Sequence, residues 1–153
     1  MRELFIDYFD TFIGRLEIVA SAKELIRIDL AQIQEKMPNR VTEQAKRWLE
    51  AYFAKRTAPL PPLAPATTPF RQKVYEATMQ VPFGECRSYK DIAIAIGQPT
   101  AYRAVAQALK RNPYMLIVPC HRIIASKGLG GYNGGIEIKK KLLEFEGCAS
   151  INL

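Results

Sequence analysis

The chain has 153 residues, 48% hydrophobic and 24% charged, enough for one domain or two small ones with a core, which excludes a disordered or fibrous protein. Residues 1–69 carry 10 Lys and Arg against nine Asp and Glu, whereas residues 70–153 carry 12 against six. A polyanion would therefore bind the second half. No apolar run approaches the roughly 20 residues of a membrane span. We expect a cytoplasmic protein with no membrane partner.

The three cysteines, Cys86, Cys120 and Cys148, and the single histidine, His121, all lie after residue 85. An odd number of cysteines without a Cys-x-x-Cys pair argues against a disulfide framework and favours a reducing compartment. The spacing of these four residues matches no common zinc finger, so we expect no metal site.

Residues 1–56 predict a small antiparallel sheet with a helix. The runs with strand-like alternation are residues 4–9, 15–20 and 25–30, with a turn at Gly14 between the first two. Residues 41–55 repeat apolar side chains at helical spacing. This part of the chain is therefore interpreted as an N-terminal α/β domain.

Residues 57–69, TAPLPPLAPATTP, contain five prolines. Proline removes a backbone donor and restricts φ, so this segment can be neither a helix nor a central strand. We interpret it as a linker, which makes residues 70–153 a second, C-terminal domain.

Three helices are predicted next, over about residues 69–80, 88–96 and 101–111. The second begins with a capping-box pattern at Ser88. Two short helices across a glycine-containing turn form the helix-turn-helix pattern, although an ordinary αα-hairpin has the same pattern.

The helix over residues 101–111 has three strips at 100° per residue. They are Tyr102, Val105 and Leu109 as the buried side, Ala101, Ala104 and Ala108 as a flat strip, and Arg103, Gln107, Lys110 and Arg111 as a basic strip. A strip of small residues beside basic groups lets a helix come close to DNA. The alternative is that the alanines pack on a neighbouring helix and the charges are solvated.

Residues 115–118 are apolar and precede Pro119-Cys120-His121-Arg122. This run predicts a buried strand or a tightly packed segment that carries Cys120 out of the core. A buried thiol is inert packing unless a base or a positive group activates it, and His121 is the only histidine. Neighbours in a strand point to opposite faces, so the pair cooperates only if the chain turns or water bridges the two side chains.

Five glycines within residues 128–135 predict a loop whose backbone approaches a flat ligand while Tyr132 closes over it, or else a flexible hairpin turn. A terminal helix is predicted over residues 136–147. The lysines at positions 139–141 are interpreted as its solvated face.

These motifs together resemble the O6-alkylguanine-DNA alkyltransferases. The resemblance rests on Asn112-Pro113, on Pro-Cys-His-Arg, on the Gly-Gly-Tyr-x-Gly-Gly loop and on Leu142-Leu143-x-x-Glu146-Gly147. It is continuous over residues 68–147 and weaker over residues 1–67. It implies an α+β fold, in which a small N-terminal antiparallel sheet with a helix is linked to a C-terminal, mainly helical, winged-helix-like domain for DNA binding and catalysis.

The resemblance also implies direct reversal of DNA damage. Cys120 would irreversibly accept the alkyl group of O6-alkylguanine, and of O4-alkylthymine, in duplex DNA, once per protein molecule and without a cofactor. His121, oriented by Glu146, would remove the thiol proton through water. Tyr89 would assist the leaving guanine, and Arg103 would fill the stack after the nucleotide flips out.

Further residues are carried over from the resemblance as contacts. The implied DNA-binding residues are Arg103, Ala104, Gln107, Arg111 and Arg122, and the implied pocket residues are Asn112, Val118, Tyr132 and Asn133. The partner would be double-stranded DNA containing O6-alkylguanine, bound by a monomer, with cooperative binding left open. Ala106, Asn133 and Cys86 depart from the common pattern, which leaves the pocket size and substrate range open but not the reaction.

Three alternatives stand beside this hypothesis. One is a non-catalytic recogniser of alkylated lesions, against which the presence of Cys120 argues. Another is a winged-helix-like DNA-binding regulator that uses residues 101–111. The third is a cysteine hydrolase with a triad of Cys120, His121 and Glu146. Product formed per mole of protein separates them, because only suicide transfer stops at one equivalent.

Overall fold

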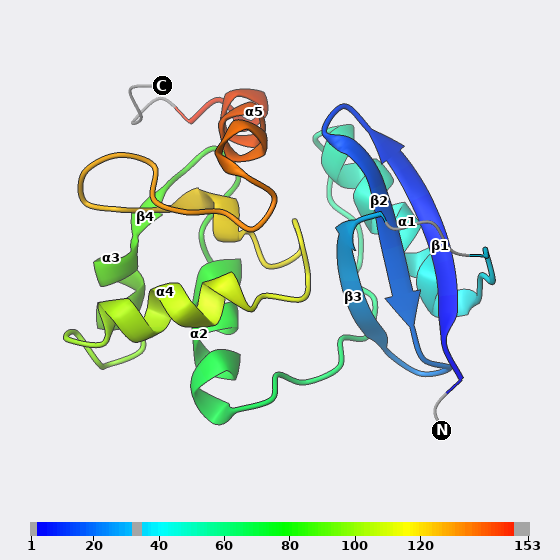
Figure 1. The fold of residues 1–153 in the computed structure, drawn as a ribbon, viewed down its shortest axis with the longest axis horizontal. Coiled ribbons are helices and arrows are strands. Elements are labelled where there is room, and N and C mark those ends of the chain that lie inside the picture. Colours follow the sequence, from blue (N-terminus) through cyan, green and yellow to red (C-terminus); the bar gives the residue numbers. More distant parts are fainter. Residues whose placement is uncertain (1–2, 32–34, 149–153) are drawn as a thin grey trace. The chain divides into compact units, whose positions relative to one another are not determined.

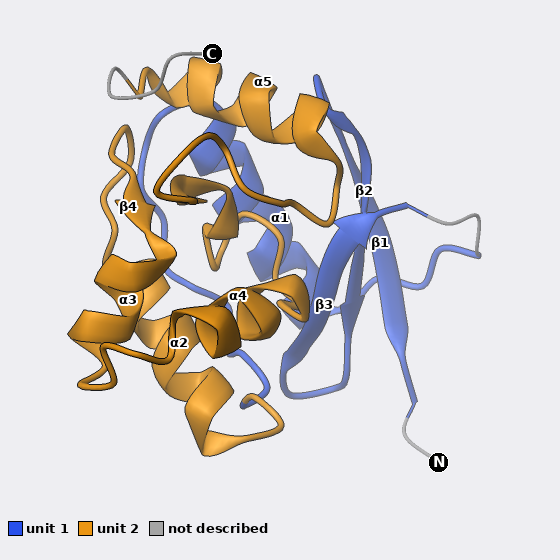
Figure 2. Ribbon diagram, turned by 60° about the vertical axis from the view of Figure 1, so that its left-hand side comes forward, with its two compact units in different colours: residues 1–65 blue, residues 66–153 orange. Residues whose placement is uncertain are grey.

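The computed structural model describes residues 3–31 and 35–148, and the chain divides into two compact units, residues 1–65 and 66–153 (Figure 2). The division falls inside the Pro-rich segment expected to be a linker. Residues 149–153 of the expected C-terminal domain lie outside the described residues. No helix among the described residues is long and apolar enough to cross a membrane.

Part of the Pro-rich segment packs on the first unit. The backbone N–H of Leu25 donates to the carbonyl of Pro62 at 2.6 Å, and the N–H of Ala64 donates to the carbonyl of Leu25 at 2.9 Å. Prolines exclude a helix here, but their carbonyls still accept hydrogen bonds at the edge of a sheet. Residues 57–65 are therefore grouped with the first unit, whereas the sequence analysis placed them in a linker.

The first unit is an antiparallel sheet in the order β1-β2-β3 with one helix (Figure 1). Its elements are β1 (Phe5–Thr11), β2 (Gly14–Ala20), β3 (Leu25–Leu30) and α1 (Arg40–Phe53). Thr11 pairs with Gly14, so residues 12–13 form the turn and Gly14, with φ +120°, opens β2. The three strands and the helix predicted from the sequence are confirmed.

Alternating side chains of the sheet and one face of α1 make the core of the first unit. Its fully buried apolar side chains include Leu16, Ile18, Leu25, Ala45 and Leu49. Helix α1 begins at a capping box, in which Asn39 Oδ1 accepts from the Thr42 N–H and Thr42 Oγ1 accepts from the Asn39 N–H. The predicted helical periodicity therefore marks the face that is buried.

The second unit is mainly helical (Figure 1). Its elements are α2 (Pro69–Met79), β4 (Arg87–Ser88), α3 (Tyr89–Ala95), α4 (Tyr102–Lys110), the 3₁₀ helix η1 (Cys120–Arg122), β5 (Ile123–Ile124) and α5 (Ile136–Glu146). Strands β4 and β5 pair in parallel. These elements confirm the helices expected from the sequence and the α+β class.

Helices α3 and α4 form the expected pair of short helices across a tight turn. Ser88 Oγ accepts from the Asp91 N–H and Asp91 Oδ2 accepts from the Ser88 N–H, so the predicted capping box is present. Gly97, with φ +77°, follows the end of α3. The phenol of Tyr75 on α2 donates to the Ala108 carbonyl on α4 at 2.7 Å.

The buried face of α4 differs from the expected one at two positions. Val105 and Leu109 are buried as predicted, but Tyr102 is 43% exposed and Ala108 is buried. Helix α4 is bonded to α2 next to Ala108, through the Tyr75 phenol and the Ala108 carbonyl, whereas Tyr102 is the first residue of the helix.

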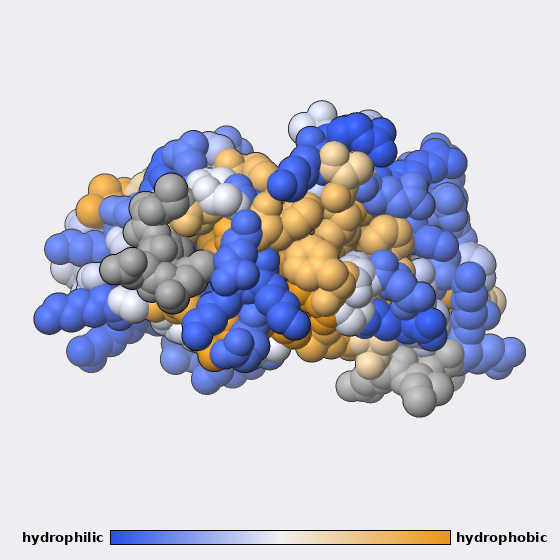
Figure 3. Space-filling view, turned by 90° about the horizontal axis from the view of Figure 1, so that it is seen from above, coloured by the Kyte–Doolittle hydropathy of each residue, from blue (hydrophilic) through white to orange (hydrophobic). Residues whose placement is uncertain are grey.

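The surface seen in Figure 3 mixes hydrophilic side chains with apolar areas. The large apolar side chains exposed among the described residues include Leu4, Phe12, Met37, Leu60, Phe83, Ile94, Tyr102 and Ile136. Single exposed apolar side chains are normal on a protein surface, so they do not define a site by themselves.

Candidate active site

The buried segment before Cys120 is a tight turn and not a strand. The Val118 N–H donates to the Tyr114 carbonyl at 3.0 Å, and Leu116 adopts a φ of +73°. Burial of residues 115–118 was predicted correctly. The strand alternative was wrong, because apolar composition reports burial but does not report backbone conformation.

The chain turns again at Cys120. Pro119 has φ −80° and ψ 64°, and the Cys120 N–H donates to the Val118 carbonyl at 2.7 Å, which is an inverse γ-turn. Cys120 then opens the helix η1. Because the chain turns here, Cys120 and His121 are not held on opposite faces as they would be in a strand. The turn that the sequence analysis required for their cooperation is therefore present.

His121 and Glu146 form a fully buried pair. Nε2 of His121 lies 2.6 Å from Oε2 of Glu146, and neither side chain is exposed. Arg122 donates to the same carboxylate through Nε at 2.7 Å and through Nη2 at 3.1 Å. The Glu146 carboxylate thus joins α5 to η1. In the described part of the chain, no group of three or more His, Cys, Asp or Glu side chains is arranged to hold a metal ion.

The charges of this pair follow from its surroundings. Burial raises the pKa of Glu146, but hydrogen bonds from His121 and Arg122 outweigh that effect and lower it to about 2. Burial lowers the pKa of His121. Glu146 is therefore a carboxylate and His121 a neutral imidazole that donates through Nε2. His121 Nδ1, buried and without a hydrogen-bond partner in the structure, keeps its lone pair as a base.

The surroundings of the Cys120 thiol act on its pKa in opposite directions, and the net effect is to raise it. Nδ2 of Asn112 donates to Cys120 Sγ at 3.3 Å and to the Val118 carbonyl at 2.9 Å. Burial raises the pKa of Cys120, while the bond from Asn112, the charge of Lys139 and nearby backbone N–H groups act in the opposite direction. At rest the group is a thiol, and it needs a base to become a nucleophile.

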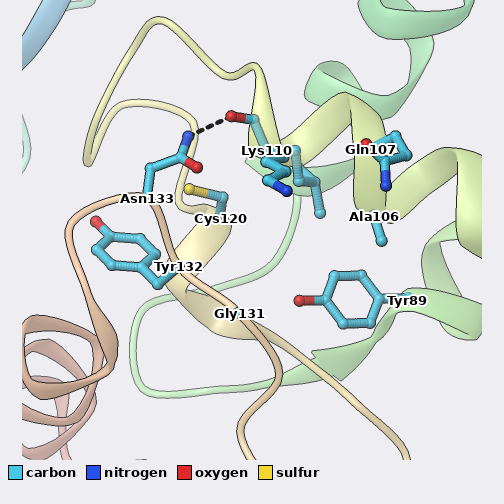
Figure 4. A pocket seen from close by; sticks show the side chains of 9 residues that line it. Tyr89, Ala106, Gln107, Lys110, Cys120, Gly131, Tyr132 and Asn133 are labelled. Carbon is cyan, nitrogen blue, oxygen red and sulfur yellow. Dashed lines mark hydrogen bonds between the residues drawn. The ribbon is translucent and has the colours of Figure 1, made fainter.

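Cys120 opens onto a pocket of about 330 Å³ in the second unit (Figure 4). The pocket is lined by Tyr89, Ala106, Gln107, Leu109, Lys110, Cys120, Gly131, Tyr132 and Asn133. In Figure 4 the sulfur of Cys120 and the hydroxyl of Tyr89 both point into this space. Helix α4, η1 and the glycine-rich loop thus enclose one cavity that contains a thiol and a phenol.

The glycine-rich loop lines the pocket and comes very near to Tyr89. A Cβ at Gly130 would lie 2.7 Å from the Tyr89 hydroxyl, and φ of Gly130 is +73°. Asn133 donates through Nδ2 to the Lys110 carbonyl at the end of α4. The loop is therefore tied to α4 and approaches the phenol of Tyr89 with bare backbone.

Lys139 is a site residue that the sequence interpretation missed. It was expected on a solvated face, but it is fully buried. Its ammonium donates to the carbonyls of Ile123, Leu129 and Gly131 at 2.7, 2.5 and 3.0 Å. Burial lowers its pKa to about 8. The available signal was helical spacing. Lys139 lies four residues before the buried Leu143, so it falls on the buried stripe of α5.

Four of the five expected DNA contacts lie on one exposed face. Arg103, Ala104, Gln107 and Arg111 are exposed on α4 or at its C-terminal end, within about 100° of one another at helical spacing.

Arg122 and Val118 do not fit their expected roles. Arg122 is 12% exposed, pairs with Glu146 and donates through Nη1 to the Val81 carbonyl at 2.8 Å, so its guanidinium is occupied inside the protein. Val118 is buried outside the pocket, and its carbonyl already accepts two hydrogen bonds, from Asn112 and Cys120. Both residues shape the turn around Cys120.

The fold and site define a two-unit α+β protein whose helix-turn-helix unit encloses a pocket with a cysteine thiol. Two family models match it. One, described as the DNA binding domain of 6-O-methylguanine DNA methyltransferase, covers residues 69–148. The other, described as the ribonuclease-like domain of 6-O-methylguanine DNA methyltransferase, covers residues 4–64. The chain belongs to the 6-O-methylguanine DNA methyltransferase family.

Relatives match along most of their length. A methylated-DNA–protein-cysteine methyltransferase of Methanosarcina barkeri is 37% identical over 94% of this chain and 97% of its own. One of Metallosphaera sedula is 38% identical over 88% and 87%. The crystal structure of Mycobacterium tuberculosis OGT in complex with DNA has a TM-score of 0.80 at 38% identity, covering 93% of this chain and 92% of that one.

Proposed function

We propose that this protein repairs O6-alkylguanine in duplex DNA by moving the alkyl group onto Cys120, once per molecule. The observation that carries the proposal is the thiol of Cys120 at the pocket, held by Asn112 and adjacent in sequence to a buried histidine with an ionised carboxylate behind it. Membership of the family supports the reaction class. O4-alkylthymine stays a prediction as a second substrate.

The transfer is a single displacement. His121 Nδ1 takes the proton of Cys120 through water, and the thiolate attacks the alkyl carbon. A C–S bond forms as the C–O bond breaks, and the electron pair of the C–O bond stays on the guanine oxygen. Glu146 holds the imidazole in the tautomer that leaves Nδ1 unprotonated and stabilises the imidazolium that forms.

The leaving guanine must be neutralised in the pocket. The hydroxyl of Tyr89 points into the cavity, and burial raises its pKa, so it stays protonated and can donate to the base. Tyr132 and Asn133, both on the glycine-rich loop, line the same pocket (Figure 4). These contacts support a pocket for a planar base with its alkyl group directed at the sulfur.

The exposed face of α4 supports DNA as the partner. The target atom lies inside a base stack, so the nucleotide must be flipped out before it can enter the pocket. Arg103 is exposed on the same helix that lines the pocket through Ala106 and Gln107. Its guanidinium plane would occupy the space that the flipped base leaves. Arg111, at the end of α4, would contact phosphate.

One experiment tests the proposal. The intact mass of the protein and of its Cys120 peptide is measured after mixing with duplex DNA that contains one O6-methylguanine. We expect one added methyl group, on Cys120, saturating at one per molecule and absent in Cys120→Ala. The variant Cys86→Ser is the matched control, because it removes a thiol outside the pocket and should still accept the methyl group.

The same measurement separates the alternatives. Lesion-dependent DNA binding without added mass would favour the non-catalytic recogniser. Sequence-specific binding that is indifferent to Cys120→Ala would favour a DNA-binding regulator. Repeated turnover through an acyl intermediate would favour the cysteine hydrolase.

A further inference from the structure

Two segments of the second unit, residues 83–86 and 145–148, run side by side at the C-terminal end of α5. Three pairs of residues meet between them, each separated by 62 positions in the sequence. They are the rings of Phe83 and Phe145 with centroids 6.1 Å apart, the Gly84 N–H and Glu146 Oε1 at 3.3 Å, and the sulfurs of Cys86 and Cys148 at 2.7 Å. The constant offset shows a parallel alignment that brings the two sulfurs together.

The backbone holds both sulfurs in place. Gly147 ends α5 in the left-handed conformation, and the Cys148 N–H donates to the Leu143 carbonyl at 3.1 Å, which is a helix C-cap. On the other side, Cys86 directly precedes β4, whose Arg87 pairs with Ile123. The close contact of the sulfurs is thus set by two anchored segments and not by a free loop.

We propose that Cys86 and Cys148 are a redox site that forms an intramolecular disulfide when the protein meets a small-molecule disulfide. Neither cysteine is part of a disulfide in the structure. The 2.7 Å between their sulfurs is shorter than an ordinary non-bonded contact between two sulfur atoms. The sulfurs need to approach only slightly further to reach the ~2.05 Å of an S–S bond. This site lies outside the pocket and uses neither Cys120 nor the alkyl transfer.

The reaction proceeds in two exchanges. Cys86, the more exposed of the two, loses its proton to solvent and attacks one sulfur of the small disulfide, which releases one thiolate and leaves a mixed disulfide. Cys148 loses its proton and attacks the Cys86 sulfur, which releases the second thiolate. The two cysteines are oxidised by two electrons in total, the reagent is reduced to two thiols, and one S–S bond replaces another.

The disulfide would add a covalent cross-link to the part of the second unit that surrounds the pocket. It would close a ring that contains α3, α4, Cys120, the glycine-rich loop and α5. It would also fix the chain two residues after Glu146, whose carboxylate orients His121. Cross-linking a loop of this length restricts the unfolded chain strongly, so the oxidised protein should unfold at a temperature about 10 °C higher.

The surroundings of Cys86 set the pH dependence of its oxidation. Burial, the thiol of Cys148 and the charge of Glu146 raise the pKa of Cys86, the charge of Lys139 acts in the opposite direction, and the result is a pKa of about 12. Since only the thiolate reacts, the rate of disulfide formation should rise about tenfold per pH unit between pH 7 and pH 10. The pair is therefore slow to oxidise at neutral pH.

The test uses the full chain and oxidised glutathione as the probe. Protein is incubated at pH 8.5 and analysed by intact mass, thiol titration and non-reducing peptide mapping. We expect a loss of two hydrogens, one remaining thiol at Cys120, a peptide pair joined through Cys86 and Cys148, and a rise in Tm that dithiothreitol reverses. Cys120→Ala should lose the same two hydrogens.

Cys86→Ser and Cys148→Ser are the matched controls. Cys86→Ser should form no cross-link. Cys148→Ser should stop at a glutathione adduct on Cys86. Adducts that persist on both cysteines of the unsubstituted protein, or a cross-link that involves Cys120 or a second molecule, would overturn the proposal. Because the readout needs no DNA, its failure is distinct from a failure of alkyl transfer.

Discussion

The imidazole of His121 meets the carboxylate of Glu146 at 2.6 Å in a place where neither side chain is exposed. The two residues come from η1 and α5, and Arg122 holds the other edge of the same carboxylate. A neutral histidine with an ionised acid behind it is the arrangement that prepares a base for a neighbouring thiol.

Glu146→Gln should slow alkyl transfer about a hundredfold. The amide removes the charge that stabilises the imidazolium and no longer fixes its tautomer, and general-base catalysis is worth about that much or more. Single-turnover transfer from duplex DNA measures the rate, and gel-shift titration checks that DNA affinity is nearly unchanged. Glu144→Gln, an exposed change on the same helix, is the control. An unchanged transfer rate in Glu146→Gln would remove this residue from the site.

Arg103→Ala should slow repair of duplex DNA at least tenfold and leave the reaction with the free modified base almost unchanged. Unstacking a base costs a few kcal/mol, and Arg103 is proposed to offset that cost by filling the stack. The ratio of the two rates is the measurement. Lys141→Ala, an exposed cation on α5, controls for the loss of charge. Equal losses with both substrates would contradict the flipping role.

Lys139→Met should destabilise the second unit by about 2–4 kcal/mol, because the buried carbonyls of Ile123, Leu129 and Gly131 lose a charged donor. It should also move the pH profile of Cys120 alkylation to higher pH, since the charge of Lys139 lowers the pKa of that thiol. Denaturant unfolding and alkylation rates between pH 6 and pH 9 measure the two effects. Lys141→Met should show neither, and an unshifted profile would limit Lys139 to a structural role.

Acid should destabilise the second unit in two stages. The folded protein lowers the pKa of His121, so the unfolded chain binds more protons just below pH 6.5 and stability falls as the pH drops through that range. The pKa of Glu146 falls from an ordinary 4.5 to about 2, so its contribution is present above pH 4.5 and is lost toward pH 2. Thermal unfolding between pH 7.5 and pH 2.5 tests both stages, and Glu146→Gln should lack the second.

Much of this architecture could be predicted from local patterns. Alternation in residues 4–30 predicted three strands, and capping residues such as Ser88 marked where helices begin, because these signals act between near neighbours in sequence. The Pro-rich segment was correctly excluded from helix and strand interiors. Its attachment to β3 could not be predicted, because nothing near Pro62 indicates which distant backbone groups will bond to it.

By itself, then, the sequence determined the elements, the family and the identity of the candidate nucleophile, since these depend on periodicity and on an ordered set of motifs. Only the tertiary structure decided which charged side chains are buried: it placed Lys139 under the loop, joined Arg122 to Glu146 and set Cys86 against Cys148. The physical reason is that burial and pairing depend on segments up to 62 residues apart, and their meeting is determined by packing and not by local sequence.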